Sequence, residues 1–204
     1  CVFNKARVID ETPMVITAVA GSLAVLPCSV DPRYTEQYAD QYKVMWVSPL
    51  ETVISLQDRR LLNDMRISVE RPFMKDWNLH LRNVSVTDAG VYKCQINTDP
   101  VGTKKINLVV TEPPRIIDHT MPTDIEKPEG EMVELFCNAT GTPQPEISWY
   151  RLHKKGNGVR ERVGQTGESL VIHNISRMCG DTYECVASNG VEPAASQTFK
   201  VTVF

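Results

Sequence analysis

Two stretches decide the fold: Asp88-Ala-Gly-Val-Tyr92-Lys-Cys94 and Cys179-Gly-Asp-Thr-Tyr183-Glu-Cys185. In both, a tyrosine stands two positions before a cysteine. Each stretch is preceded, further upstream, by a cysteine and then a tryptophan, namely Cys28 and Trp46 in the first half and Cys137 and Trp149 in the second. The alternation of apolar residues ahead of both stretches is typical of half-buried strands. The chain therefore contains an internal repeat of two β-rich halves.

This order of cysteine, tryptophan, tyrosine and cysteine is the core signature of the immunoglobulin sandwich, in which a disulfide joins strands B and F. It predicts the disulfides Cys28–Cys94 and Cys137–Cys185. The wider cysteine spacing in the first half leaves room for the C′ and C″ strands of a V-type domain, and the shorter second spacing suits an I/C2-type domain. We expect an all-β protein of two tandem immunoglobulin-like domains, residues 1–112 and 113–204. The boundary falls at Pro113-Pro114, because two prolines should end a strand ladder.

Composition excludes several classes of function. The 204 residues are 42% hydrophobic and 23% charged, as in ordinary globular protein, and a net charge of −3 offers no footprint for nucleic acid. No apolar run is long enough to span a membrane, so we expect an ectodomain whose anchor lies outside this chain. The four histidines lack metal-ligand spacing, and no hydrolase or nucleotide-binding motif occurs. We therefore expect no enzyme, no metal and no cofactor.

Cysteines and glycosylation motifs indicate an oxidising compartment. Long-range disulfides persist outside the cytosol, and three N-glycosylation motifs begin at Asn83, Asn138 and Asn174. A secreted protein or one on the extracellular side of the plasma membrane is expected. Cys1 and Cys179 are not expected to pair with each other, since opposite ends of two stacked sandwiches lie too far apart for a disulfide. We expect a buried or idle thiol at Cys179, and a partner for Cys1 outside this segment stays open.

A recognition surface is predicted on the sheet of the first domain formed by strands G, F, C, C′ and C″. The expected surface has an apolar centre and a polar rim, which is the anatomy of a protein interface. The alternative is that some of these residues fill the wider core of a V-type domain. The predicted residues are Met45, Val47, Ile54, Leu56, Leu61, Leu62, Gln95, Asn97, Asp99 and Lys104. Separately, Arg66 and Asp88 should form the salt bridge that closes the lower end of a V-type domain.

Nearly the whole chain after about residue 14 resembles the DIP, lachesin and IgLON family of neuronal immunoglobulin receptors. The most specific motif is Tyr92-Lys-Cys-Gln-Ile-Asn-Thr-Asp-Pro100, supported by Asp76-Trp-Asn-Leu-His-Leu-Arg82 and Cys185-Val-Ala-Ser-Asn-Gly190. We expect an invertebrate member, such as a nematode neuronal receptor. The resemblance implies homodimers or heterodimers with related two- or three-domain receptors through the first domain, commonly between axons or at synapses. It also implies a lipid (GPI) or other membrane anchor.

Two other functions stay open at this point. A secreted ligand or decoy of the same fold would use the same surface without an anchor. A glycosaminoglycan- or growth-factor-binding module would instead use the basic stretch that contains Lys154, Lys155, Arg160 and Arg162 in the second domain.

Overall fold

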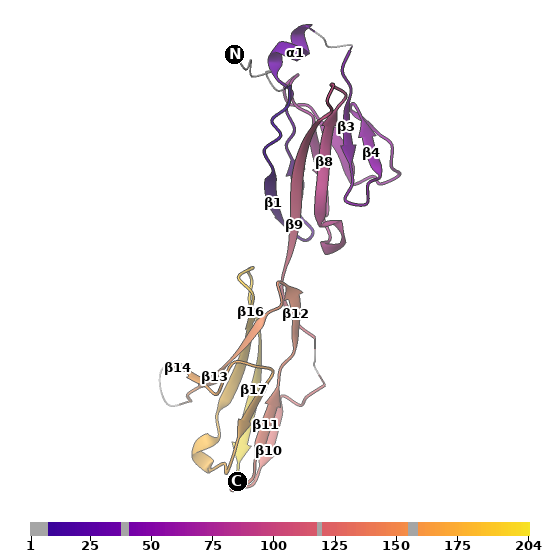
Figure 1. The fold of residues 1–204 in the computed structure, drawn as a ribbon. Helices are drawn as coiled ribbons and strands as arrows, with labels where there is room; N and C mark the ends of the chain where they lie inside the picture. Colours follow the sequence, from indigo (N-terminus) through magenta and orange to yellow (C-terminus); the bar gives the residue numbers. More distant parts are fainter. Residues whose placement is uncertain (1–7, 38–40, 118–119, 155–158) are drawn as a thin grey trace, which may run out of the picture. The chain divides into compact units, whose positions relative to one another are not determined.

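The computed structural model describes residues 8–37, 41–117, 120–154 and 159–204, and most of its regular elements are strands (Figure 1). The chain separates into two compact units, Cys1–Thr111 and Glu112–Phe204. This boundary lies one residue before the expected one. Cys1 and the turn that contains Lys155 lie outside the described residues.

The first unit packs two sheets around one core. Its front sheet has the order β1 (Met14–Val19), β9 (Gly102–Ile116), β8 (Gly90–Ile96), β3 (Val44–Val47), β4 (Val53–Leu56) and β5 (Arg59–Arg60). Its back sheet has the order β2 (Ala24–Leu26), β7 (Asn78–Leu81) and β6 (Ile67–Glu70). A short helix, α1 (Pro32–Gln37), follows the segment after β2 that bears Cys28. Strands β4 and β5 are the C′ and C″ strands expected of a V-type domain.

The core of the first unit forms where the sequence predicted it. The Cys28–Cys94 disulfide joins the two sheets with an S–S distance of 2.04 Å. Trp46 is completely buried beside it, and its indole Nε1 donates a hydrogen bond of 2.8 Å to the backbone oxygen of Trp77. Because an indole N–H needs a partner when buried, this bond fixes the ring within the core. The inward residues expected on β2, β7 and β8 are all buried.

The second unit is smaller. Its main sheet has the order β10 (Asp124–Lys127), β17 (Ala195–Val203), β16 (Thr182–Ser188), β13 (Glu146–Leu152) and β14 (Arg160–Val163). Strands β11 (Val133–Phe136) and β15 (Ser169–Ile172) form the opposite sheet. The Cys137–Cys185 disulfide is present, and Trp149 lies 5.9 Å from the ring of Phe199.

Strand β9 does not end at the two prolines, contrary to the expectation. It runs from Gly102 to Ile116 and changes partners on the way. Its first part pairs with β8 and β1, and its last part pairs with β12 (Ala139–Thr142) through Ile116 and Arg115. Pro113 and Pro114 stay extended because proline tolerates this backbone where the ladder is interrupted.

The turn before the tyrosine is built the same way in both units. The Tyr92 hydroxyl donates to the backbone oxygen of Asp88 at 2.8 Å, and the Tyr183 hydroxyl donates to that of Cys179 at 2.9 Å. These are the two tyrosine corners that the sequence signature predicted. Short 3-10 helices, η1 (Val86–Asp88) and η2 (Arg177–Cys179), carry the accepting carbonyls.

Candidate recognition surface

The outer side of the front sheet carries two rows of side chains that the strand register places side by side. We call these residues the front face. The first row is Thr103, Gln95, Met45, Leu56 and Arg59, and the second is Lys105, Lys93, Val47 and Val53. Strands β3 and β4 supply an apolar half, and strands β8 and β9 supply a polar half. The polar half contains Thr103, Gln95, Lys93 and Lys105.

The apolar half comprises Met45, Val47, Val53 and Leu56. Leu56 is 43% exposed and Val53 is 36% exposed, whereas Met45 is half-buried. Val47 is only 6% exposed but lies outside the core cluster, so its outer-face neighbours cover it. Since the inner side of these strands is already packed on the core, this apolar surface is additional to what the fold needs.

The predicted position of Ile54 on this surface is wrong. Between β3 and β4 the register passes from Trp46–Ser55 to Val47–Val53, which leaves Ile54 as the extra residue of a β-bulge. Ile54 and Ser55 are therefore both completely buried, and Val53 rather than Ile54 shares the outer side with Leu56. Side chains of a regular strand alternate between the two faces of the sheet. The extra residue of the bulge reverses this alternation for the residues that precede it in the strand. Val53 is therefore the one residue of the apolar half that the sequence analysis did not predict.

Leu62 and Lys104 were also assigned wrongly to the outer surface. Leu62 is half-buried and packs against the core cluster, as the core alternative anticipated for some of these residues. Lys104 stands opposite Cys94 on the inner side of β9, and only 9% of its side chain is exposed. Its long apolar stem follows the core, and its ammonium group reaches Asp10 at 3.4 Å.

The remaining predicted residues lie at the margin of the front face. Asn97 follows β8, and its side-chain oxygen accepts a 2.6 Å hydrogen bond from the backbone N–H of Lys43. This contact fastens the start of β3, so Asn97 has a structural role in addition to any contact with a partner. Leu61, which is 51% exposed, follows β5, and Asp99 is exposed in the loop between β8 and β9.

The lower end of the first unit is closed by the predicted ion pair. Arg66 donates to both carboxylate oxygens of Asp88, at 2.7 and 3.0 Å, and it also holds Asp64 at 2.9 Å. The hydrogen bond from Arg66 lowers the pKa of Asp88 below its ordinary value, although partial burial opposes this effect. Burial also raises the pKa of Tyr92 to about 12. This cluster is structural.

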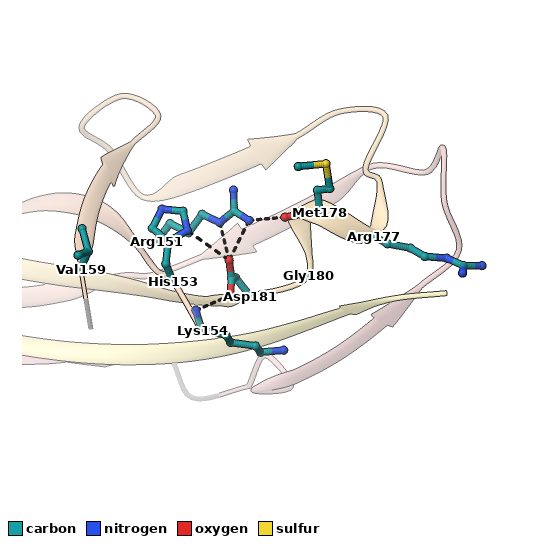
Figure 2. Close-up of a pocket in the computed structure, with 8 residues that line it drawn as sticks. All are labelled: Arg151, His153, Lys154, Val159, Arg177, Met178, Gly180 and Asp181. Carbon is teal, nitrogen blue, oxygen red and sulfur yellow. Dashed lines mark hydrogen bonds and ion pairs between the residues drawn. The ribbon is translucent and has the colours of Figure 1, made fainter. Parts of the chain in front are cut away.

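Figure 2 shows the corresponding end of the second unit, where a cavity of about 560 Å³ opens beside Asp181. Arg151 Nε donates to Asp181 at 2.8 Å, and the backbone N–H of Lys154 donates to the other oxygen at 3.1 Å. Burial favours the neutral form of Asp181, but these donors hold its pKa below the ordinary value. His153 contacts Asp181 and also Glu161, at 3.6 and 2.7 Å. These charged groups are paired with one another. We therefore interpret the cavity as part of the contact that closes this end of the domain, and not as a binding site.

In the described part of the chain, no cluster of three or more histidine, cysteine or acidic side chains is arranged to hold a metal ion. Among the same residues, no helix has the length and apolar character needed to cross a membrane.

Comparison with known proteins defines the class. The chain matches the immunoglobulin V-set domain over residues 11–111 and a further immunoglobulin domain family over residues 113–189. Together with the two B–F disulfides, these matches make it a tandem immunoglobulin-domain protein, V-type followed by I/C2-type, as the sequence predicted. Both matched families are immunoglobulin domains, and neither is an enzyme family.

Individual relatives specify the family. Limbic system-associated membrane protein of Rattus norvegicus is 33% identical over 189 residues, which is 92% of this chain and 52% of the relative. A chain in the crystal structure of Dpr11 IG1 bound to DIP-gamma IG+IG2 is 35% identical with a TM-score of 0.70, covering 97% of this chain and 96% of that one. DIP-gamma IG1+IG2 gives 33% identity and a TM-score of 0.70 over 97% and 95%.

The chain belongs to the DIP, lachesin and IgLON family of neuronal immunoglobulin-superfamily receptors, in agreement with the resemblance seen in the sequence. It spans about half the length of the limbic system-associated membrane proteins that it matches.

Proposed function

We propose that this chain is the recognition region of a neuronal cell-surface receptor, and that the front face of its first domain binds the first domain of a related immunoglobulin receptor. The observation that carries the proposal is the apolar half of the front face. Its four apolar side chains project from the outer side of a sheet whose inner side is already packed. Burying such a surface against a partner is favourable, and a polar margin is typical of interfaces between separately folded proteins.

The structural relatives support the choice of partner. One matched structure contains Dpr11 bound to DIP-gamma, and another, at 34% identity and a TM-score of 0.69, contains Dpr2 in complex with DIP-theta and covers 96% of this chain and 65% of that one. By extension, the partner of this chain is a related immunoglobulin receptor or a second copy of the chain. An extracellular location, with an anchor outside this chain, and N-glycans at Asn83, Asn138 and Asn174 belong to the same proposal.

No observation specifically supports a secreted ligand or a glycosaminoglycan-binding module. A secreted form would use the same front face. Two of the four basic residues proposed for glycosaminoglycan binding are engaged within the second domain. Arg160 pairs with Glu184 at 3.0 Å, and Arg162 donates to Thr166 at 2.8 Å.

A matched pair of substitutions tests the proposal. Leu56 and Val171 are exposed to similar extents, 43% and 39%, on outer strand positions of the first and second domains. After a binding screen against immunoglobulin receptors of the same organism, Leu56→Asp should weaken binding of the identified partner about a hundred-fold, or roughly 3 kcal/mol, because it buries an unpaired carboxylate. Val171→Asp should leave affinity unchanged, and both variants should fold as judged by circular dichroism. Normal binding by a folded Leu56→Asp variant would place recognition elsewhere.

A further inference from the structure

The strands of the front sheet contain basic residues and no acidic ones. Over β1, β3, β4, β5, β8 and the part of β9 up to residue 111, no aspartate or glutamate occurs. The basic residues of these strands are Arg59, Arg60, Lys93, Lys104 and Lys105. The chain as a whole has a net charge of −3, so this sheet is a local exception to the overall charge.

Three of these five cations are engaged within the domain. Lys93 pairs with Glu51 at 2.5 Å, and Lys104 reaches Asp10 at 3.4 Å. Arg60 donates to the backbone oxygen of Ile67 at 3.0 Å. Arg59 and Lys105 are exposed and have no ion-pair partner in the described part of the chain. Of the other acidic residues close to this sheet, Asp58 and Asp99 lie in turns beyond the strand ends, and Glu11, which precedes β1, accepts a 3.0 Å hydrogen bond from the backbone N–H of Thr103.

Arg59 and Lys105, the two exposed cations without an ion pair in the described part of the chain, stand on opposite edges of the front face. Lys105 lies on β9, beside Lys93 in the register, and Arg59 lies on β5, beside Leu56. The apolar half lies between Arg59 and the polar half that contains Lys105. Any partner that covers the apolar half therefore also approaches at least one of these cations.

A second copy of the same face is a poor match for this pattern. In a two-fold dimer each surface patch meets its own symmetry mate. If the two faces overlap completely with apolar half on apolar half, the two polar halves also meet and the Lys105 ammonium groups approach each other, whereas a smaller contact centred on the apolar half keeps them apart. If the copies are turned so that opposite edges meet, Lys105 of one copy approaches Arg59 of the other and the apolar half covers a polar one. Both complete overlaps bring like charges together, which opposes association.

From this pattern we infer that the front face selects a partner whose corresponding sheet carries carboxylates at its margins, and that it disfavours self-association. This inference rests on the proposed function, because it takes the front face to be the binding surface. Complementary charges at the margin of an interface speed encounter with the right partner and suppress wrong ones, whereas the apolar half supplies affinity.

A charge-reversed copy of the protein can stand in for the acidic partner. The test mixes the wild-type chain with the double variant Arg59→Glu/Lys105→Glu and measures association by analytical ultracentrifugation at about 50 mM and about 500 mM salt, where screening lengths differ several-fold. The mixed complex should be at least ten-fold tighter than either protein with itself at low salt, and the advantage should shrink at high salt. The neutral variant Arg59→Gln/Lys105→Gln should self-associate more tightly than the wild type.

The matched control is Lys154→Glu/Lys200→Glu, which changes net charge equally at exposed positions of the second domain. Mixed with the wild type, it should associate no better than the wild type with itself. A charge-reversed mixture that forms no complex, or one no tighter than the wild-type self-complex, would overturn the inference. The Leu56→Asp variant distinguishes a failure of the charge inference from a failure of the proposed function. If Leu56→Asp still abolishes binding of the identified partner, only the charge inference falls, and if it has no effect, the front face itself is the wrong surface.

Discussion

The two domains use corresponding sheets very differently on their outer sides. In the second domain Arg160 on β14 pairs with Glu184 on β16 at 3.0 Å, and its guanidinium lies 3.9 Å over the ring of Tyr150. On that face Arg160 is paired with an acid of a neighbouring strand, while Lys200 on β17 is exposed. In the first domain, Met45, Val53 and Leu56 form an apolar surface flanked by Arg59 and Lys105, which have no ion-pair partner in the described part of the chain. The fold thus accommodates either outer surface, and the apolar one is where we propose that a partner binds.

The same comparison applies to the ends of the sandwiches, which the two domains close with unrelated ion pairs. Arg66 and Asp88 close the first domain. In the second domain the position of Asp88 is taken by Cys179, and Arg151 on β13 pairs instead with Asp181, which immediately precedes β16. Cys179 remains a half-buried thiol that contacts Ser176 at 3.8 Å. The fold therefore requires a closing contact but does not prescribe its residues.

The largest expected effect on stability comes from removing these two pairs in turn. Asp181→Asn should destabilise the second domain by about 3 kcal/mol, because Asp181 is buried and its loss leaves Arg151 unpaired. Asp88→Asn should cost the first domain less, about 2 kcal/mol, because Arg66 keeps Asp64. Hydrogen exchange of the intact chain, followed by mass spectrometry, resolves the two domains. Equal losses from the two substitutions would mean that burial does not distinguish the two pairs.

Acid should weaken both domains through the same carboxylates. The folded pKa values of Asp88 and Asp181 are lowered. Their contribution to stability is therefore complete above the unfolded aspartate pKa of about 3.9 and is lost as pH falls through the folded values. Urea unfolding across this range should show stability falling below about pH 4, with a shallower fall in Asp88→Asn and Asp181→Asn. A slope unchanged in both variants would assign acid sensitivity to other groups.

The smallest effect is expected from the glycosylation motifs. Replacing Asn83, Asn138 and Asn174 with aspartate should abolish glycan mass on the secreted protein but change partner affinity by no more than a few-fold, since none of them lies on the front face. Asn83 and Asn174 also have left-handed backbone conformations, with φ values of 48° and 49°, which asparagine and aspartate tolerate. A ten-fold change in affinity would show that a glycan contributes to recognition.

An Asn-x-Ser motif can result from the requirements of a turn as well as from glycosylation, and Asn83 and Asn174 both lie in such turns. Each lies in the turn before a 3-10 helix, and Ser85 caps the first of these helices through its hydroxyl. The Asn-x-Ser pattern is therefore explained by turn chemistry at Asn83, independently of any glycan. Asn138, which lies between β11 and β12, has no such explanation.

The fold could be predicted from the sequence because the signature residues all lie in the two cores. Cys28, Trp46, Tyr92 and their repeats must meet inside a sandwich, so their spacing defines the strands. The outer face was predicted less completely, because a single bulge at Ile54 reverses which side the neighbouring residues occupy, and nothing in the local sequence marks it. Lys104 was misplaced because a lysine is not expected at an inner strand position. Its apolar stem nevertheless packs there, and its ammonium group forms an ion pair with Asp10.

The central claim, that the partner covers the apolar half of the front face, is tested most directly by hydroxyl-radical footprinting of the unmodified chain with and without its partner. Met45 and Leu56 lie in the apolar half, whereas Met132 and Met178, which are 49% and 84% exposed, report on the second domain. Binding should reduce oxidation of Met45 and Leu56 and leave Met132 and Met178 unchanged. Protection of Met132 or Met178, with Met45 and Leu56 as reactive as in the free chain, would contradict the account.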